Sequence, residues 1–245
     1  IMKSIIIIPS RMDSTRFPGK PLVNINGIPM IQRVWQQAIN SDIGDVIVAC
    51  SEIEVFNLID SLGGRAILTD PNLPSGTDRI YSAVTEKKNN IDFDCVINLQ
   101  GDMPLIKSDQ IKKVIEPIKN NYSIGTLATD LLENESLNPN VTKVVIDWKN
   151  DKIGKAKEFF RLRDKIDNNT FHHVGIYSYT KESLFNFAKL PKSKNEISLK
   201  LEQYRAIDAG ISIGVTFEKN IPPSIDTKED LITAESIIRA NHEKN

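Results

Sequence analysis

Residues 4–9 read SIIIIP, residues 45–50 read DVIVAC and residues 94–100 read DCVINLQ. The apolar, largely β-branched character of these runs is typical of parallel strands that are covered on both faces of a sheet. Residues 65–69 are interpreted as a further short strand. Between the runs, apolar residues recur with helical spacing, as in the helix over 55–62 that ends at Gly63-Gly64. This alternation predicts a doubly wound, mixed but mostly parallel α/β sheet with right-handed crossovers.

The remaining elements are expected to follow a less regular order. Helices are predicted from Pro29 to residue 38, over 78–87, over 111–118, over 197–207 and over 228–241. Strands are predicted over 124–131, 143–148, 154–160, 172–179 and 211–218, with a turn at Asn150-Asp151. Because no linker rich in Gly, Ser or Pro separates the halves, we expect one α/β domain over 2–245. A β-rich subdomain is expected to be inserted at about 123–180.

Composition restricts the partners of the chain. Its 245 residues carry 31 Lys and Arg against 32 Asp and Glu, a net charge of −1, so no bulk positive field would attract nucleic acid or an anionic membrane. An anionic ligand must therefore be held by a local basic cluster. The longest pure apolar run is strand-sized, well short of the roughly 20 residues that cross a membrane. Cys50 and Cys95 both lie in apolar runs, which is typical of buried reduced thiols, and a cytoplasmic location is expected.

The loop after the first strand, residues 10–22, carries Arg11, Arg16 and Lys20 within ten positions. Guanidinium groups bind phosphate oxygens in pairs and a lysine adds a point charge, so this loop is suited to a polyphosphate. Gly19 allows the backbone to come close to such a ligand. The GxxxxGK[ST] and GxGxxG patterns are absent, which argues against a P-loop or a dinucleotide fold. A solvated connecting loop is the alternative.

Two aspartates are candidate metal ligands. Asp102 follows a strand and a glycine and precedes Pro104, and Asp226 precedes the last predicted helix. Mg²⁺ prefers one or two carboxylates together with phosphate and water oxygens. Each aspartate could instead be a helix cap, Asp102 for the helix near Ser108 and Asp226 in place of Thr227.

Two further segments have both a functional and a structural interpretation. Residues 75–79 (SGTDR) offer hydroxyls and backbone N–H groups to a base or ribose, but they also form an ordinary helix N-cap. Residues 172–177 (HHVGIY) predict a strand on which His173, Gly175 and Tyr177 share one face. A strand histidine is most often structural, and no His or Cys spacing here indicates zinc or a nucleophilic triad.

Taken together in order, these motifs resemble the 3-deoxy-manno-octulosonate (Kdo) cytidylyltransferase family, from about Ile5 to Ile232. The first part of the resemblance is PSR at 9–11, STRFPGKPL at 14–22 and INGIPM at 25–30. It continues with SGTDR at 75–79, QGD at 100–102, PL at 104–105, NPN at 138–140 with Lys143, HVGIY at 173–177, LEQ at 201–203 with Arg205, IDT at 225–227 and EDL at 229–231. One such motif would be weak, whereas this series in order is specific.

The resemblance implies a nucleotide-diphospho-sugar transferase-like fold and the reaction of CTP with Kdo to give CMP-Kdo and pyrophosphate, assisted by Mg²⁺. It implies a homodimer formed through the inserted region. The residues implied to hold the triphosphate are Arg11, Arg16 and Lys20, and those implied to hold the metal are Asp102 and Asp226. The nucleotide site would be lined by Pro9, Ser10, Arg11, Lys20, Ser75, Gly76, Gln100 and Asp102. The sugar would be held by Arg79, Gln100, His173, Tyr177, Glu202 and Gln203.

The chain departs from the family pattern in ways that keep alternatives open. Met103 stands where the family commonly has an acidic residue or glutamine, and residues 159–163 (FFRLR) match only loosely, so the sugar contact expected of Arg161 is open. A related acidic sugar such as 8-amino-Kdo is therefore an alternative acceptor. A non-catalytic nucleotide-binding module is the alternative from another functional class.

Overall fold

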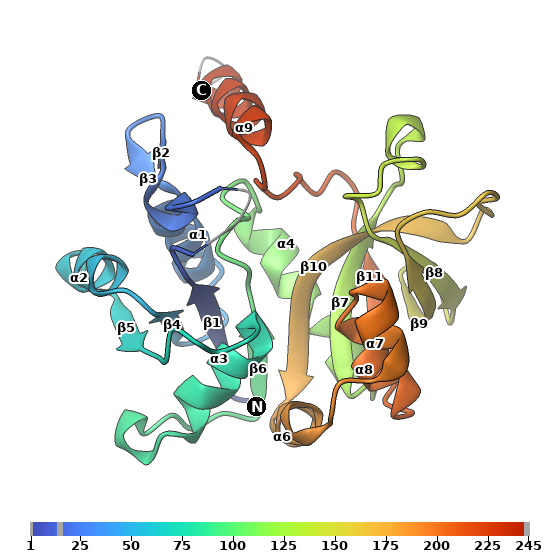
Figure 1. The fold of residues 1–245 in the computed structure, drawn as a ribbon, viewed down its shortest axis with the longest axis horizontal. Helices are drawn as coiled ribbons and strands as arrows, with labels where there is room; N and C mark the ends of the chain where they lie inside the picture. The colour runs from blue at the N-terminus through green and yellow to red at the C-terminus, as the bar shows by residue number, and fades with distance from the viewer. Residues whose placement is uncertain (1, 14–16, 243–245) are drawn as a thin grey trace. The chain divides into compact units, whose positions relative to one another are not determined.

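The computed structural model describes residues 2–13 and 17–242, which form two compact units (Figure 1). The first unit is made of Ile1–Phe93, Asn98–Ile111 and Pro222–Asn245. The second is made of Asp94–Ile97 and Lys112–Ile221. The chain thus leaves the first unit at Asp94, returns to it at Asn98, leaves it again at Lys112 and returns at Pro222 for its last helix.

The first unit contains the predicted parallel strands. Strand β1 is followed in space by β4 and then β5, and both pairings are parallel, with Ile6 opposite Val46 and Ile47 opposite Arg65. Every residue of β1 is buried, as expected for a strand covered on both faces. The bounds are β1 (Ser4–Ser10), β4 (Val46–Cys50), β5 (Arg65–Leu68), α1 (Met30–Asn40), α2 (Ile53–Ser61), α3 (Gly76–Thr85), η1 (Lys20–Leu22) and η2 (Lys87–Asn89).

A small hairpin that was not predicted packs with the last helix. Strands β2 (Asn24–Ile25) and β3 (Ile28–Pro29) are joined by Asn26 and Gly27, which have φ values of 46° and 80°. Both residues are left-handed, which is the geometry that Asn-Gly favours in a tight hairpin. Helix α9 (Lys228–His242) closes this region through one apolar cluster. The buried members of the cluster are Phe17, Ile25, Met30, Ile225, Ala234 and Ile238.

The second unit contains a sheet that closes on itself. Its strand order is β6-β10-β7-β11-β9-β8, and β8 pairs again with β10, so that Thr170 lies opposite Val145. Closure leaves β8 paired on both sides over part of its length, which removes an exposed sheet edge there. The bounds are β6 (Cys95–Asn98), β7 (Ile124–Thr129), β8 (Lys143–Trp148), β9 (Ile153–Phe160), β10 (Thr170–Thr180), β11 (Ile213–Phe217) and η3 (Glu133–Glu135).

Two helical predictions in the later part of the chain were wrong in detail, and one helix was missed. The helix expected over 111–118 is divided into α4 (Ser108–Lys113) and α5 (Glu116–Lys119), because Pro117 is tolerated only in the first turn of a helix. The helix expected over 197–207 is divided into α7 (Lys194–Leu199) and α8 (Gln203–Asp208) by Lys200, which is left-handed at φ 55°. Helix α6 (Lys181–Lys189) was not predicted.

The turn expected at Asn150-Asp151 is confirmed, since β8 and β9 pair antiparallel around it. Cys50 and Cys95 are both buried, as expected, and burial raises the pKa of Cys50 to about 12. Among residues 2–13 and 17–242, no helix combines the length and the apolar character that crossing a membrane requires.

Candidate functional site

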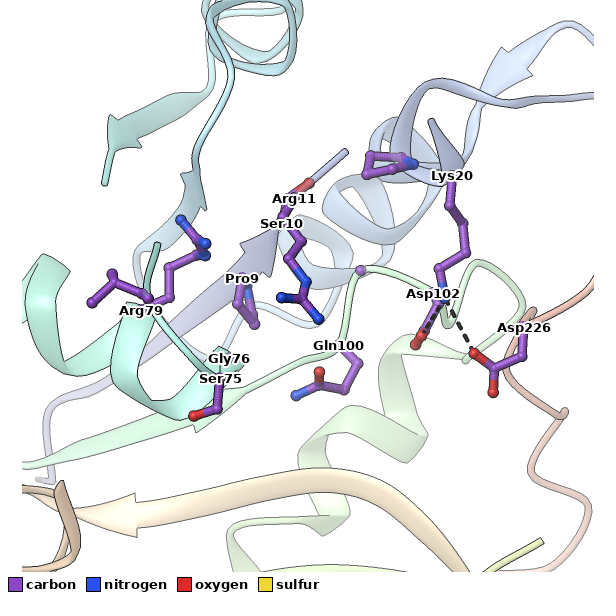
Figure 2. Close-up of a pocket in the computed structure, with 13 residues that line it drawn as sticks. Pro9, Ser10, Arg11, Lys20, Ser75, Gly76, Arg79, Gln100, Asp102 and Asp226 are labelled. Carbon is purple, nitrogen blue, oxygen red and sulfur yellow. Dashed lines mark hydrogen bonds and ion pairs between the residues drawn. The ribbon is translucent and has the colours of Figure 1, made fainter. Parts of the chain in front are cut away.

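The centre of the candidate site is the ammonium group of Lys20. Its Nζ donates to Asp102 Oδ2 at 2.8 Å, to the carbonyl oxygen of Ile225 at 3.1 Å and to Asp226 Oδ1 at 3.3 Å. Three donors of one ammonium thus meet three acceptors. Figure 2 shows the Lys20 side chain reaching down to the two carboxylates. The structure therefore brings together three predicted residues that come from distant parts of the sequence.

Neither aspartate is a helix cap. At the start of α4 the backbone N–H of Lys107 donates to Gln110 Oε1 at 3.0 Å, so Asp102 takes no part there. At the start of α9 the backbone N–H of Asp230 donates to Thr227 Oγ1 at 3.2 Å, which makes Thr227 the cap. The backbone N–H of Ile225 donates to the carbonyl oxygen of Asp102 at 2.8 Å and so joins the two carboxylate-bearing segments.

The electrostatics of this group favour a cation. Burial raises the pKa of Asp102, Lys20 opposes that shift by charge and hydrogen bonding, and Asp226 adds to it by repulsion. Two carboxylates and one ammonium leave a local charge of about −1. In the part of the chain that the structure describes, no group of three or more His, Cys, Asp or Glu side chains could hold a metal. A metal at this pair of carboxylates would therefore need further oxygens from a substrate or from water.

A pocket of about 260 Å³ adjoins this group (Figure 2). It includes all the predicted nucleotide-binding residues: Pro9, Ser10, Arg11, Lys20, Ser75, Gly76, Gln100 and Asp102. It is also lined by Asp226 and by Arg79, which were predicted for other roles, and by Pro21, Leu73 and Gly101, which were not predicted. Pro21 and Gly101 adjoin predicted residues in the sequence, whereas an isolated loop leucine such as Leu73 carries no signal.

Gly76 and Ser75 form one wall of this pocket. A Cβ atom on Gly76 would lie 3.1 Å from Cγ of Pro9 and 3.6 Å from Oε1 of Gln100, so the glycine allows α3 to approach β1 closely. The Ser75 hydroxyl accepts from the backbone N–H of Asp78 at 3.1 Å and is the N-cap of α3. The structural interpretation of Ser75 is thus confirmed, and the same residue lines the pocket.

The predicted arginines have different surroundings. Arg11 is exposed, and Figure 2 shows its side chain pointing toward the middle of the pocket residues. Arg79 is buried, and its Nη1 donates to Thr69 Oγ1 at 2.5 Å and to the carbonyl oxygen of Asp70 at 3.2 Å. Its Nη2 is buried and has no hydrogen-bond partner among the described residues. Burial lowers the pKa of Arg79. Arg16 lies outside the described residues.

The second unit contains the other predicted sugar-site residues. His173 and Tyr177 lie on β10, and their ring centroids are 5.5 Å apart. The Tyr177 side chain hydrogen-bonds to Gln203, and burial, with the charges of Tyr179 and Glu202, raises the pKa of Tyr177 well above its usual value. Tyr177 is therefore a neutral phenol. His173, Tyr177, Glu202 and Gln203 thus belong to one connected region of this unit.

The sequence predicts that simple alternation places His173, Gly175 and Tyr177 on one face of a strand. In the structure, a bulge and not simple alternation brings His173 and Tyr177 to one face. Against β7, Val174 pairs with Leu127 and Tyr177 pairs with Thr126, so β10 advances three residues while β7 advances one. This bulge places Gly175 and Ile176 outside the ladder. Four residues of regular strand span about 13 Å, so only the bulge explains the short distance between the two rings.

Sequence reasoning assigned no role to three buried side chains of the second unit. Arg205 is buried and binds Glu196 through two donors, Nε to Oε2 at 2.9 Å and Nη2 to Oε1 at 2.5 Å. The Tyr204 hydroxyl donates to the carbonyl oxygen of Phe159 at 2.8 Å. Lys143 is fully buried and donates to the carbonyl oxygens of Asn138 and Arg161, each at 2.7 Å. A buried Arg or Lys is rare without such partners, but its burial cannot be read from periodicity.

Met103 is buried with 3% of its surface exposed. Met103, which departs from the family pattern, is therefore an apolar side chain buried at the turn after β6.

Comparisons with known proteins identify the family that this chain resembles. Residues 5–215 match the family described as cytidylyltransferase. Two relatives named 3-deoxy-manno-octulosonate cytidylyltransferase are similar along their length. The one from Paramagnetospirillum magneticum is 39% identical over 240 residues, covering 96% of this chain and 98% of the relative. The one from Rhodopseudomonas palustris is 40% identical over 239 residues, covering 96% and 98%.

A solved structure, described as CMP:2-keto-3-deoxy-manno-octonic acid synthetase complexed with CTP, has a similar fold. It matches with a TM-score of 0.88 and 32% sequence identity, covering 98% of this chain and 99% of the other. The mixed α/β fold expected from the sequence is thus the fold of nucleotidyltransferases of this kind.

Proposed function

The chain belongs to the 3-deoxy-manno-octulosonate cytidylyltransferase family, and we propose that it joins CTP to Kdo, releasing pyrophosphate and forming CMP-Kdo. The observation that carries this proposal is the pocket in which Lys20 lies against Asp102 and Asp226 beside the predicted nucleotide-binding residues. That combination is suited to a nucleoside triphosphate, because it offers cationic groups for phosphates and carboxylates for a counter-cation.

The reaction is an in-line displacement at the α-phosphorus. The oxygen of the sugar's anomeric hydroxyl forms the new bond to phosphorus, the bond to the β-phosphate oxygen breaks, and the hydroxyl proton leaves to solvent. Such a transfer requires mainly positioning and charge neutralisation. Arg11 and Lys20 are suited to bind the triphosphate and to stabilise the departing pyrophosphate, and the family resemblance assigns the same role to Arg16.

Asp102 and Asp226 are proposed to hold Mg²⁺. Two carboxylates on one cation are a ligand set that Mg²⁺ accepts when substrate phosphates complete its coordination, and the present cation between them is the Lys20 ammonium. When bound, Mg²⁺ supplies charge neutralisation at phosphate oxygens and acidifies a neighbouring hydroxyl. Lys20 remains a donor that orients both carboxylates.

The residues proposed to contact the sugar are those that the family resemblance implies. Gln100 and Arg79 line the pocket, and Arg79 Nη2 has a donor that no described protein group uses, which suits a carboxylate. His173, Tyr177, Glu202 and Gln203 carry the contacts to the sugar hydroxyls in this proposal. Their support is the family resemblance and the polar connection of Tyr177 to Gln203.

The proposal also includes a cytoplasmic homodimer. Residues 123–180 are proposed to act as an inserted β-rich subdomain that forms the dimer interface. The burial of both cysteines, Cys50 and Cys95, is consistent with a reducing compartment. Sedimentation of the purified chain tests the dimer directly, because a concentration-independent monomer would contradict it.

Turnover of the purified protein and of its Asp102→Asn variant tests the function. Pyrophosphate release is expected to require CTP, Mg²⁺ and Kdo together, and chelation by EDTA should abolish it. Asp102→Asn should reduce turnover by about 10²-fold or more, because one proposed metal ligand is lost. Asp92→Asn is the matched control, since Asp92 lies in an exposed ion pair with Lys3.

Other outcomes would contradict the proposal. Near-normal turnover of Asp102→Asn, with its unfolding unchanged, would remove Asp102 from the metal site. Faster turnover with 8-amino-Kdo than with Kdo would identify a different acidic sugar as the substrate. CTP binding without turnover on either sugar would favour a non-catalytic nucleotide-binding module.

A further inference from the structure

The hydroxyl of Thr126 lies at the centre of the bulge in β10. Thr126 Oγ1 is 3.1 Å from the carbonyl oxygen of Val174, 2.8 Å from that of Ile176 and 3.0 Å from Nε2 of His173. Thr126 has no exposed surface, so these contacts are made out of reach of water. They belong to one unit and to the two paired strands β7 and β10.

The hydrogen-bond partners of this hydroxyl determine which nitrogen of the His173 ring carries the proton. A threonine hydroxyl has one proton to donate and lone pairs that accept. The carbonyls of Val174 and Ile176 can only accept, so the hydroxyl proton is directed to them. Nε2 of His173 must then be the donor to Thr126. The opposite arrangement would turn the hydroxyl proton to Nε2 and leave the two carbonyls facing a lone pair.

We infer that Thr126 is a positioning residue that holds His173 as the neutral Nε2–H tautomer, so that Nδ1 is the acceptor for a hydroxyl of the sugar substrate. The inference rests on the proposed function, because it assigns the chemistry by which His173 recognises that substrate. An unprotonated Nδ1 accepts from a hydroxyl and cannot donate to a carboxylate. The histidine therefore selects the polyhydroxylated part of the acidic sugar and not its charged end.

The surroundings of the ring support a neutral, fixed imidazole. Burial, followed by the charge of His172, lowers the pKa of His173 to about 3. Phe159 lies edge-on to the ring with centroids 5.0 Å apart, and Tyr177 covers it at 5.5 Å. Among residues 2–13 and 17–242, the protein supplies no hydrogen bond to Nδ1 of His173.

The bulge explains why this arrangement needs Thr126 in particular. Tyr177 pairs with Thr126 and His173 pairs with Ala128, two residues apart on β7. The two rings are therefore placed as side chains two residues apart on a regular strand would be, on the same face. The Thr126 hydroxyl contacts the His173 ring at Nε2, and the whole Thr126 side chain is buried. A serine would supply the same donor and acceptor, whereas a valine would supply neither.

Nitrogen-15 NMR of the histidine rings tests the tautomer directly. The chain has three histidines, so His173 can be assigned by comparison with a His173→Gln variant. At neutral pH, Nε2 of His173 is expected to carry the proton and Nδ1 to have the shift of an unprotonated ring nitrogen. Detection of the Nδ1–H tautomer, or of a doubly protonated ring, would overturn the inference whether or not the protein makes CMP-Kdo.

Kinetics of Thr126 variants test the link to substrate. Thr126→Val should raise the KM for Kdo roughly tenfold with an unchanged KM for CTP, and it should populate both tautomers in the NMR spectrum. Thr126→Ser should restore both properties. Thr129→Val is the matched control, because Thr129 is a buried threonine on the same strand that is not bonded to the His173 ring.

The outcomes separate the inference from the proposed function. The expected tautomer together with no turnover of CTP and Kdo would contradict the function alone. Normal turnover with equal KM values for Kdo in Thr126→Val and the parent protein would overturn the role of Thr126. If Thr126→Val does not fold, the NMR spectra of the parent protein and of Thr126→Ser still decide, because loss of the Nε2–H tautomer in Thr126→Ser contradicts the inference.

Discussion

Lys20 Nζ and Asp102 Oδ2 lie 2.8 Å apart, although 82 positions separate the two residues in the sequence. Lys20 begins η1 after the basic loop, and Asp102 follows the strand that ends at Asn98. The contact thus joins a proposed phosphate-binding group to a proposed metal ligand. It makes the two functions interdependent, since a change at either residue alters the charge seen by the other.

Replacement of Lys20 should affect the nucleotide more than the sugar. Lys20→Ala removes a cation from the pocket and leaves the partly buried Asp102 without its main counter-charge, so the KM for CTP should rise by about tenfold or more. The KM for Kdo should change by less. Steady-state kinetics with each substrate varied in turn measure this difference, with the exposed Lys3→Ala as control. A larger effect on the sugar would contradict the assignment of the loop to the triphosphate.

A methyl group on Gly76 should narrow the nucleotide pocket. The added Cβ of Gly76→Ala would lie 3.1 Å from the ring of Pro9, which belongs to the buried strand β1 and cannot easily move. We expect weaker CTP binding, by roughly five- to tenfold, with little loss of stability. Calorimetric titration with CTP measures the affinity. Gly27→Ala is not a suitable control because Gly27 has a positive φ, whereas Gly175→Ala meets no atom within 4 Å and lies in the other unit.

The buried pair of Arg205 and Glu196 should be important for folding. Arg205→Met leaves the Glu196 carboxylate buried without its two donors, which should lower the free energy of unfolding by about 3–5 kcal/mol. Arg239→Met provides the contrast, because the Arg239–Glu235 pair is exposed and should contribute about 1 kcal/mol or less. Urea denaturation of both variants measures the difference. Equal losses would show that the burial of Arg205 has no energetic consequence.

His173 should make the protein less stable in acid. The pKa of His173 is lowered to about 3 in the folded state from a usual value of about 6.5. Below pH 6.5 the unfolded chain therefore binds a proton at this histidine that the folded protein does not bind. Stability therefore falls as the pH decreases from 6.5 toward 3. His173→Gln should show a shallower decrease in unfolding free energy over this range. Above pH 7.5, where His173 is neutral in both the folded and the unfolded state, the unfolding free energies of the parent protein and the variant should change in parallel. A steeper loss of unfolding free energy in acid for the variant would contradict the lowered pKa of His173.

Much of the first unit could be predicted from the sequence, because β-branched runs and helical spacing report burial directly. Strand β1 and helix α1 begin and end close to the predicted positions. The hairpin at Asn26-Gly27 was missed although this dipeptide is a strong hairpin signal, since the strands that flank it have only two residues each.

The second unit depends on tertiary contacts that periodicity does not report. Lys200 ends α7 in a left-handed conformation, with its backbone N–H bonded to the carbonyl oxygen of Glu196. Because lysine rarely adopts this conformation, its presence in the sequence does not predict the break between α7 and α8. The bulge that brings His173 to Tyr177 likewise depends on the pairing of β10 with a strand far away in the sequence. The convergence of Asp102 and Asp226 followed from the family resemblance, because spacing alone could not distinguish them from helix caps.

The anchoring of Asp226 has a consequence for the protein during its synthesis. Ile225 joins the apolar cluster with Phe17 and Met30, and its backbone binds Asp102, so the second carboxylate reaches Lys20 only when the segment before α9 has docked. A ribosome-bound chain that has not yet exposed residue 226 lacks this carboxylate at Lys20. Assembly of the carboxylate pair is thus delayed until residue 226 has been translated, and a nascent chain released before that point carries only one of the two carboxylates.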